Sequence, residues 1–110
     1  MTAARWRLLF LAALVFAFVM AVLPHPPRLA GDPDDKIQHI IAFATLGLLG
    51  HFAFRELQAL RLVTGLSLFG AVIEIVQTIP ALNRDGDIID WAADTLTVIF
   101  VLALLRLARR

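Results

Sequence analysis

The chain has 110 residues, of which 60% are hydrophobic and 17% are charged, and its mean hydropathy is +0.82. Soluble domains are about 45–50% apolar and about 25% charged, and so short a chain has too little interior to bury the excess. The 10 basic and 9 acidic residues nearly balance, and there is no cysteine. The composition excludes disulfides and thiolate metal sites, and it argues against a soluble enzyme, a nucleic-acid binder and a disordered chain.

Four apolar segments, taken in chain order, approach the length of about 20 residues that a membrane-spanning helix needs. They cover residues 8–23, 37–54, 62–79 and 88–105. At this chain length, only helices satisfy their own backbone polar groups in lipid. We therefore predict an all-α fold, an integral membrane four-helix bundle in which residues 1–110 form a single domain.

The first segment also has two features of a secretory signal peptide, a basic start and an apolar stretch. Its end, however, carries bulky residues and Pro24, Pro26 and Pro27, where a signal peptide has small residues before its cleavage site. We predict a retained helix, and whether the cell trims this segment stays open.

The short connecting segments predict the orientation, because arginine and lysine concentrate on the cytoplasmic side of a membrane. With the amino terminus inside, the inner segments hold Arg5, Arg7, Arg55, Arg61, Arg106, Arg109 and Arg110. The outer segments hold only Arg28, Lys36 and Arg84. This bias predicts that both termini are cytoplasmic.

Polar residues gather at one depth of the predicted spans, which is the outer end in this orientation. Asp35, His39 and Phe43 are spaced four apart and share one face of the second span. Glu74 and Gln77 are three apart and share a face near the end of the third. Polar groups inside a membrane are costly and usually face other protein, so we expect both faces to point into the bundle.

A third polar stripe opens the fourth span. Asp87, Asp90 and Asp94 are spaced three and four apart on one helix face, and Asp87 is suited to cap the helix. Lys36 and Arg84 add two cations at the same depth. Together the three stripes predict a polar pocket that contains one imidazole, several carboxylates and two cations.

Other residues predict packing and membrane contact. Glycines in the second and third spans favour close approach of the helices: Gly47, Gly50, Gly65 and Gly70. Trp6 and Trp91 fit the aromatic belts at the two interfaces. His51 stands apart near the inner end of the second span, where we expect an interfacial side chain without a special role.

The order and spacing of the polar residues resemble the VanZ-like family of small bacterial membrane proteins. The resemblance rests on D-K-x-x-H-x-x-x-F at Asp35, Lys36, His39 and Phe43, on E-x-x-Q at Glu74 and Gln77, and on R-x-x-D-x-x-D-x-x-x-D-T at Arg84, Asp87, Asp90, Asp94 and Thr95. These motifs cover residues 35–97. The family usually has Asn at the position of Asp94 and Gly at the position of Thr97.

The family is named after a protein linked to resistance against the glycopeptide teicoplanin. The resemblance implies a role in the bacterial cell envelope and a location in the plasma (inner) membrane. It marks the polar residues as the site, but it does not imply a reaction, so whether the chain is an enzyme stays open.

Two functional hypotheses follow. In the first, the outer pocket binds or modifies an amphiphile with an anionic head group, such as a lipid-linked envelope molecule. Lys36 and Arg84 then hold the head group, and His39, Glu74 and Asp90 supply any acid–base chemistry. The other ligand-binding candidates are Asp35, Gln77, Asp87 and Asp94. In the second, the chain is a non-enzymatic scaffold or accessory subunit that binds other membrane proteins, and the polar cluster only locks its helices together.

No cofactor is predicted. His39, Glu74 and the aspartates of the third stripe are ligand types that a hard divalent cation takes, but they match no fixed metal motif. Pairing of these carboxylates with Lys36 and Arg84 is the favoured alternative. Ion translocation is disfavoured because the inner halves of the spans hold few polar groups beyond His51.

Overall fold

The computed structural model describes residues 1–22, 35–79 and 88–108, with Asp35 and Lys36 described by their backbone alone. These residues form four helices: α1 (Ala3–Val22), α2 (Asp35–Ala53), α3 (Ala59–Gln77) and α4 (Ile88–Ala108). The described part of the chain is thus all-helical, as predicted. Three helices, α1, α3 and α4, are long and apolar enough to cross a membrane, whereas the apolar part of α2, Ile37–Ala53, is shorter.

The helices have 20, 19, 19 and 21 residues. At about 1.5 Å of rise per residue they are about 28–32 Å long, which matches a hydrocarbon core about 30 Å thick. Three of them extend beyond the predicted spans at the arginine-rich end: α1 begins at Ala3, α3 begins at Ala59 and α4 ends at Ala108, whereas α2 ends at Ala53, one residue before the predicted end. The prediction counted apolar residues, whereas the helices also include flanking arginines.

Side chains of threonine cap two of the helix ends. Thr2 precedes α1, and its Oγ1 accepts a hydrogen bond from the backbone N–H of Arg5 at 3.2 Å. This is the N-cap interaction that satisfies a donor left over in the first turn. At the end of α3, the hydroxyl of Thr78 donates to the carbonyl of Ile75 at 2.6 Å. The contact at Thr2 explains why α1 starts before its apolar stretch.

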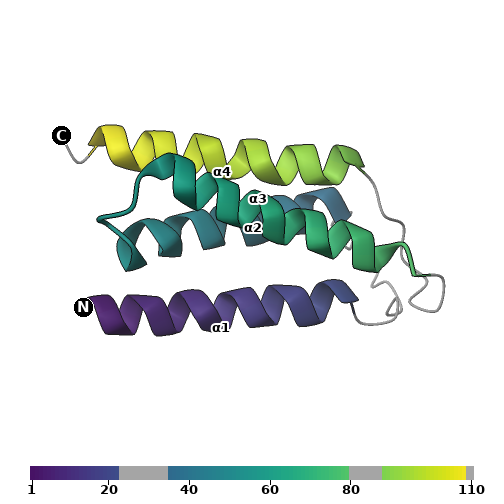
Figure 1. Cartoon of the computed structure of the whole chain (residues 1–110), viewed down its shortest axis with the longest axis horizontal. Coiled ribbons are helices and arrows are strands. Elements are labelled where there is room, and N and C mark those ends of the chain that lie inside the picture. The colour runs from purple at the N-terminus through teal and green to yellow at the C-terminus, as the bar shows by residue number, and fades with distance from the viewer. Residues whose placement is uncertain (23–34, 80–87, 109–110) are drawn as a thin grey trace.

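The four helices run alternately up and down, so α1 begins and α4 ends at the same end of the bundle (Figure 1). We call this the terminal end, and we call the opposite end, where α2 and α4 begin, the distal end. The helix α2 packs against each of the other three. The helices α1 and α4 lie on opposite sides of α2 and α3 (Figure 1).

The core is a set of apolar side chains from all four helices, and a second apolar set covers the outside. The buried set is Phe10, Phe43, Leu46, Ala53, Leu62, Leu66, Ile73, Val98 and Leu102. Large exposed apolar residues occur on every helix and include Leu8, Phe16, Ile41, Leu68, Ile75, Leu96 and Phe100. An apolar exterior around a small core is the distribution that lipid contact favours.

Two of the four glycines in the predicted packing positions illustrate the close approach of the helices. A Cβ at Gly50 would lie 3.2 Å from Cε1 of Phe10, and one at Gly70 would lie 3.4 Å from Cζ of Phe43. The packing prediction is confirmed at both positions. It is wrong at Gly65, where no described atom lies within 4 Å of the added Cβ.

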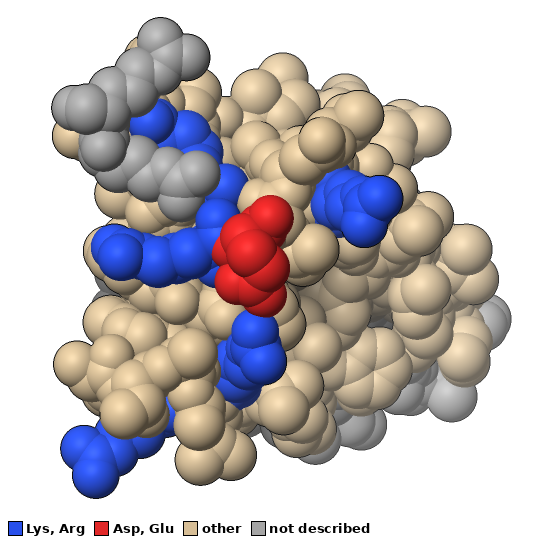
Figure 2. Space-filling view, turned by 60° about the vertical axis from the view of Figure 1, so that its left-hand side comes forward, with Lys and Arg blue, Asp and Glu red and all other residues tan. Residues whose placement is uncertain are grey.

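At the terminal end, basic side chains surround an acidic patch (Figure 2). Nη2 of Arg7 lies 2.9 Å from Oε1 of Glu56, and Nε of Arg7 donates to the carbonyl of Ala53 at 2.9 Å. The indole of Trp6 stacks on Phe52 with ring centroids 4.7 Å apart. These contacts fasten the start of α1 to the end of α2 and to the turn that follows it.

The prediction for His51 is wrong. This side chain is 2% exposed, and its Nδ1 accepts a hydrogen bond from Nε of Arg106 at 2.9 Å. The same guanidinium donates to the carbonyl of Leu57 at 2.8 Å. The last turn of α4 lies over the end of α2, so His51 joins a buried interhelical network. Its partner is 55 residues away in the sequence, and spacing along one helix does not reveal it.

Candidate functional site

Polar side chains from three helices meet near the distal end of the bundle. His39 lies four residues after the start of α2, Glu74 three before the end of α3, and Asp94 six after the start of α4. At about 1.5 Å per residue these positions are about 6, 4.5 and 9 Å from their helix ends. The predicted convergence of the stripes at one depth is therefore confirmed for these three residues, which we call the distal cluster.

The imidazole of His39 is the centre of the distal cluster. Its Nδ1 lies 3.1 Å from Oδ2 of Asp94, within hydrogen-bonding distance, and 3.9 Å from Oε1 of Glu74. One potential ligand atom from each of the three residues lies within 4.8 Å of the others. The cluster thus brings together an acid–base group and two carboxylates, which is also a set of groups that binds metal ions.

Both carboxylates of the distal cluster are buried. Asp94 is 1% exposed and Glu74 is 8% exposed. Oδ1 of Asp94 is buried and has no hydrogen-bond partner among the described residues. Buried polar oxygens are usually satisfied by protein, water or an ion, so this oxygen points to a further ligand.

Asp90 lies one helical turn before Asp94 and is also buried, with 6% exposure. It interacts electrostatically with His39 and with Asp94. The stripe predicted for the start of the fourth span therefore faces the bundle at both of its described positions. Asp90 adds a third buried carboxylate beside the distal cluster.

Gln77 is buried, as the shared face with Glu74 predicts, but it makes its contact with α1. Its Nε2 donates a hydrogen bond to the carbonyl of Ala21 at 3.0 Å. The contact ties the end of α3 to the end of α1. Its partner is a backbone carbonyl, a group that every residue carries, and the sequence offers no signal for it.

Four of the predicted ligand-binding residues cannot be placed beside the cluster. Arg84 and Asp87 lie outside the described residues, and so do the side chains of Asp35 and Lys36. The described part of the site therefore consists of one imidazole and three carboxylates, without the two predicted cations.

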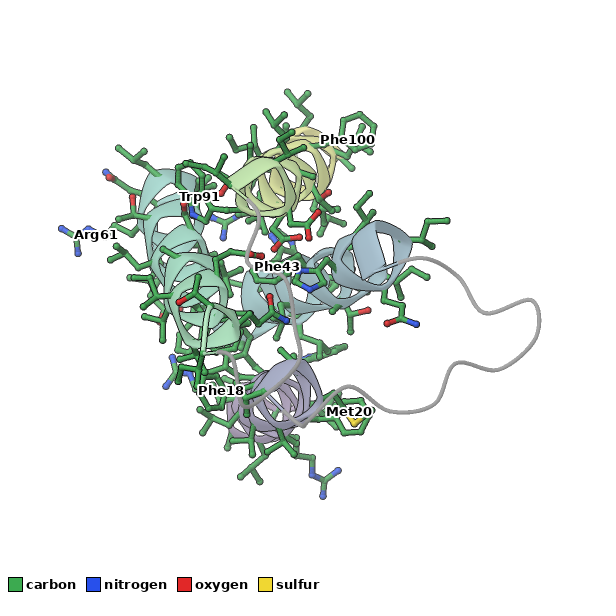
Figure 3. All side chains as sticks on the ribbon, turned by 90° about the vertical axis from the view of Figure 1, so that its right-hand side faces the viewer. Phe18, Met20, Phe43, Arg61, Trp91 and Phe100 are labelled. Atoms are coloured by element: carbon green, nitrogen blue, oxygen red, sulfur yellow. The ribbon has the colours of Figure 1, made fainter. Side chains whose placement is uncertain are left out.

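Aromatic and hydroxyl side chains lie next to the distal cluster, on the side that faces the terminal end. Phe43, one turn after His39, points into the centre of the bundle, and Trp91 lies between α3 and α4 (Figure 3). The indole Nε1 of Trp91 donates to the carbonyl of Ser67 at 2.9 Å, and the hydroxyls of Ser67 and Thr95 are 3.0 Å apart. Trp91 therefore joins α3 and α4.

A buried apolar layer separates the distal cluster from the network of His51 and Arg106. It consists of Phe43, Leu46, Val98 and Leu102, each at most 2% exposed. Because α2 and α4 carry these residues between their two polar groups, the described residues do not form a continuous polar path along the bundle.

Comparisons with protein-family models, with curated proteins and with solved structures find no match for this chain.

Proposed function

We propose that the chain is a multi-pass protein of the bacterial inner membrane, of the VanZ-like type, with both termini in the cytoplasm. In this proposal the distal cluster is a site in the outer leaflet for an amphiphile with an anionic head group. The polar motifs support the family, and the apolar exterior together with three helices of spanning length supports the membrane location. The arginines at the terminal end support the orientation.

The observation that carries the proposal is the contact of the part-buried His39 with the buried carboxylates of Asp94 and Glu74. Ionisable groups inside a membrane bundle are costly and commonly mark a functional site. Here three helices each contribute one such group at the same depth. A cluster needed for packing alone could be replaced by apolar side chains, often without loss of stability. Stability alone therefore does not account for these three groups.

The proposed roles follow the chemistry of each group. Lys36 precedes His39 in the sequence and Arg84 lies between Glu74 and Asp94. In this proposal both cations hold the head group, and the guanidinium of Arg84 is suited to bind it with two parallel hydrogen bonds. The hydrogen bond to Asp94 orients the imidazole of His39, as a carboxylate commonly does for a histidine that transfers protons. Glu74 and Asp90 supply further acid–base capacity if the amphiphile is modified.

The test is expression in a bacterium sensitive to envelope-directed antibiotics, including teicoplanin. Glu74→Gln and Asp90→Asn are compared with the wild-type chain, and Glu56→Gln is the matched control because its carboxylate lies at the terminal end. We expect wild type and Glu56→Gln to shift the inhibitory concentrations equally, and both cluster variants to lose the shift at unchanged protein level. Wild-type behaviour of both cluster variants contradicts the proposal.

The second candidate is a non-enzymatic scaffold whose distal cluster is structural. The hydrogen bond between His39 and Asp94 favours this candidate, because it joins α2 to α4 and Asp94 is only 1% exposed. This candidate predicts that Glu74→Gln depletes the protein from the membrane, because a buried partner is lost. A Glu74→Gln variant that is folded and abundant but inactive argues for the first function.

A further inference from the structure

We propose that His39, Glu74 and Asp94 bind one divalent transition-metal cation, and that this cation receives the phosphate or carboxylate of the amphiphile. The second part rests on the proposed function, whereas the cation site itself does not. The described ionisable groups of the site are three carboxylates and one imidazole, whereas the proposed ligand is an anion. Such a set repels an anionic head group when it is ionised, and a cation bound by it adds to the positive charge that Lys36 and Arg84 supply in the proposed function.

The distances fit a single ion. Ligand atoms bound at about 2.0–2.2 Å in tetrahedral geometry lie about 3.4 Å from one another. Nδ1 of His39 lies 3.1 Å from Oδ2 of Asp94 and 3.9 Å from Oε1 of Glu74. These two distances differ from that value by at most about half an ångström, and all three ligand atoms lie within 4.8 Å of one another, so the carboxylates approach one ion by side-chain rotation.

The second oxygen of Asp94 points to the same ligand independently of these distances. Oδ1 of Asp94 is buried without a hydrogen-bond partner in the described ranges 1–22, 35–79 and 88–108, although the residue is 1% exposed. An Nδ1 atom that binds the ion carries no proton, so Asp94 exchanges its hydrogen bond with His39 for coordination of the ion. A bound cation supplies the partner that burial of this oxygen demands.

The position of Glu74 also favours a cation. It lies in the last turn of α3, where the helix dipole places partial negative charge. A carboxylate there is disfavoured, and a cation beside it is favoured by both the carboxylate and the dipole. The dipole of α3 and the carboxylates of Glu74 and Asp94 therefore all favour a cation at this point.

The donor set suggests the kind of ion. One imidazole nitrogen and two carboxylate oxygens suit zinc or a similar transition metal better than magnesium or calcium, which prefer oxygen ligands alone. Three protein ligands leave one position of a tetrahedral ion open. An oxygen of the head group fits that position, so the ion would bridge an acidic site and an anionic ligand.

The test is titration of the purified, detergent-solubilised full chain with Zn²⁺ after treatment with a chelator. We expect one equivalent to bind, and we expect X-ray absorption of the wild-type complex to show one histidine nitrogen and otherwise oxygen ligands. His39→Gln and Asp94→Asn should each weaken binding by at least about tenfold. His25→Gln, which changes a histidine outside the described residues, should leave it unchanged.

Three results overturn the proposal: no stoichiometric binding by folded wild type, binding unaffected by both ligand variants, or an absorption spectrum without a histidine ligand. The spectrum of the wild type decides the matter even if the variants fail to fold. The envelope assay separates this proposal from the proposed function. If the wild-type chain binds Zn²⁺ but the cluster variants keep the wild-type antibiotic phenotype, the proposed function alone is contradicted. If the cluster variants lose that phenotype but the wild-type chain does not bind Zn²⁺, the cation site alone is contradicted.

Discussion

The Nδ1 atom of His39 lies 3.1 Å from Oδ2 of Asp94, and this contact joins residues that are 55 positions apart in the sequence. It connects the beginning of α2 to the beginning of α4 across the centre of the bundle. In an apolar bundle a polar contact of this kind is specific, because few alternative partners are within reach. The environment of this pair, with Glu74 close by, is the basis of the functional proposals.

The first prediction separates the hydrogen bond of this pair from its charge. Asp94→Asn keeps a hydrogen-bonding group beside His39, whereas Asp94→Leu removes it and leaves the imidazole without this partner. We expect Asp94→Leu to lower the free energy of unfolding by about 1–3 kcal/mol more than Asp94→Asn. Thermal unfolding in detergent, followed by circular dichroism, measures the difference. Equal loss in both variants would show that the charge of Asp94, and not its hydrogen bond, stabilises the fold.

The second prediction concerns the glycines. Gly50→Val places methyl groups against the ring of Phe10, because the Cβ alone lies 3.2 Å from that ring, whereas Gly65 faces open space. Overpacking of a core typically costs about 1–3 kcal/mol, so Gly50→Val should unfold at lower temperature while the matched Gly65→Val should not. The same detergent unfolding assay applies. Similar destabilisation by both substitutions would contradict the assigned packing of Gly50 against Phe10, because valine has a higher helix propensity than glycine and Gly65 has no such neighbour.

The third prediction concerns the network at the terminal end. A double-mutant cycle of His51→Leu and Arg106→Met should give a coupling energy of about 0.5–3 kcal/mol, because the two side chains share a hydrogen bond and His51 is buried. The exposed pair of Arg7 and Glu56 provides the comparison and should give only about 0.2–1 kcal/mol. Additive effects of the two substitutions at His51 and Arg106 would refute the inferred contact.

The fourth prediction tests the orientation. The chain has no cysteine, so single cysteines report their side of the membrane without interference. Gln58 precedes α3 and Ile79 follows it, at opposite ends of the helix. A thiol reagent that does not cross membranes should label Ile79→Cys in intact cells and Gln58→Cys only after permeabilisation. Labelling in the reverse pattern would place the distal cluster on the cytoplasmic side and remove the outer-leaflet site.

Much of the fold could be predicted from composition and periodicity. Four apolar segments became four helices, because the length of an apolar run and its helical register depend on local sequence alone. The helix ends were less predictable. Arginines extend α1 and α4 beyond their apolar stretches, and the capping hydroxyl of Thr2 acts outside the span that hydropathy defines.

The site was partly predictable for the same reason. Spacing of three and four places side chains on one helix face, and burial of Glu74, Asp90 and Asp94 agrees with that expectation. Spacing does not show which residue of another helix lies opposite. Gln77 was therefore grouped with the pocket although its amide contacts Ala21, and His51 was separated from Arg106 although the two are hydrogen-bonded.

The central claim is that the distal cluster binds a ligand and does not only hold the helices together. Native mass spectrometry of the chain purified from bacterial membranes tests it most directly, with wild type beside Glu74→Gln and the control Glu56→Gln. We predict that wild type and Glu56→Gln carry an additional mass from a metal ion, an anionic amphiphile or both, and that folded Glu74→Gln has lost it. A wild-type chain without any bound mass, together with a Glu74→Gln variant that collapses, would contradict the claim and favour the structural scaffold.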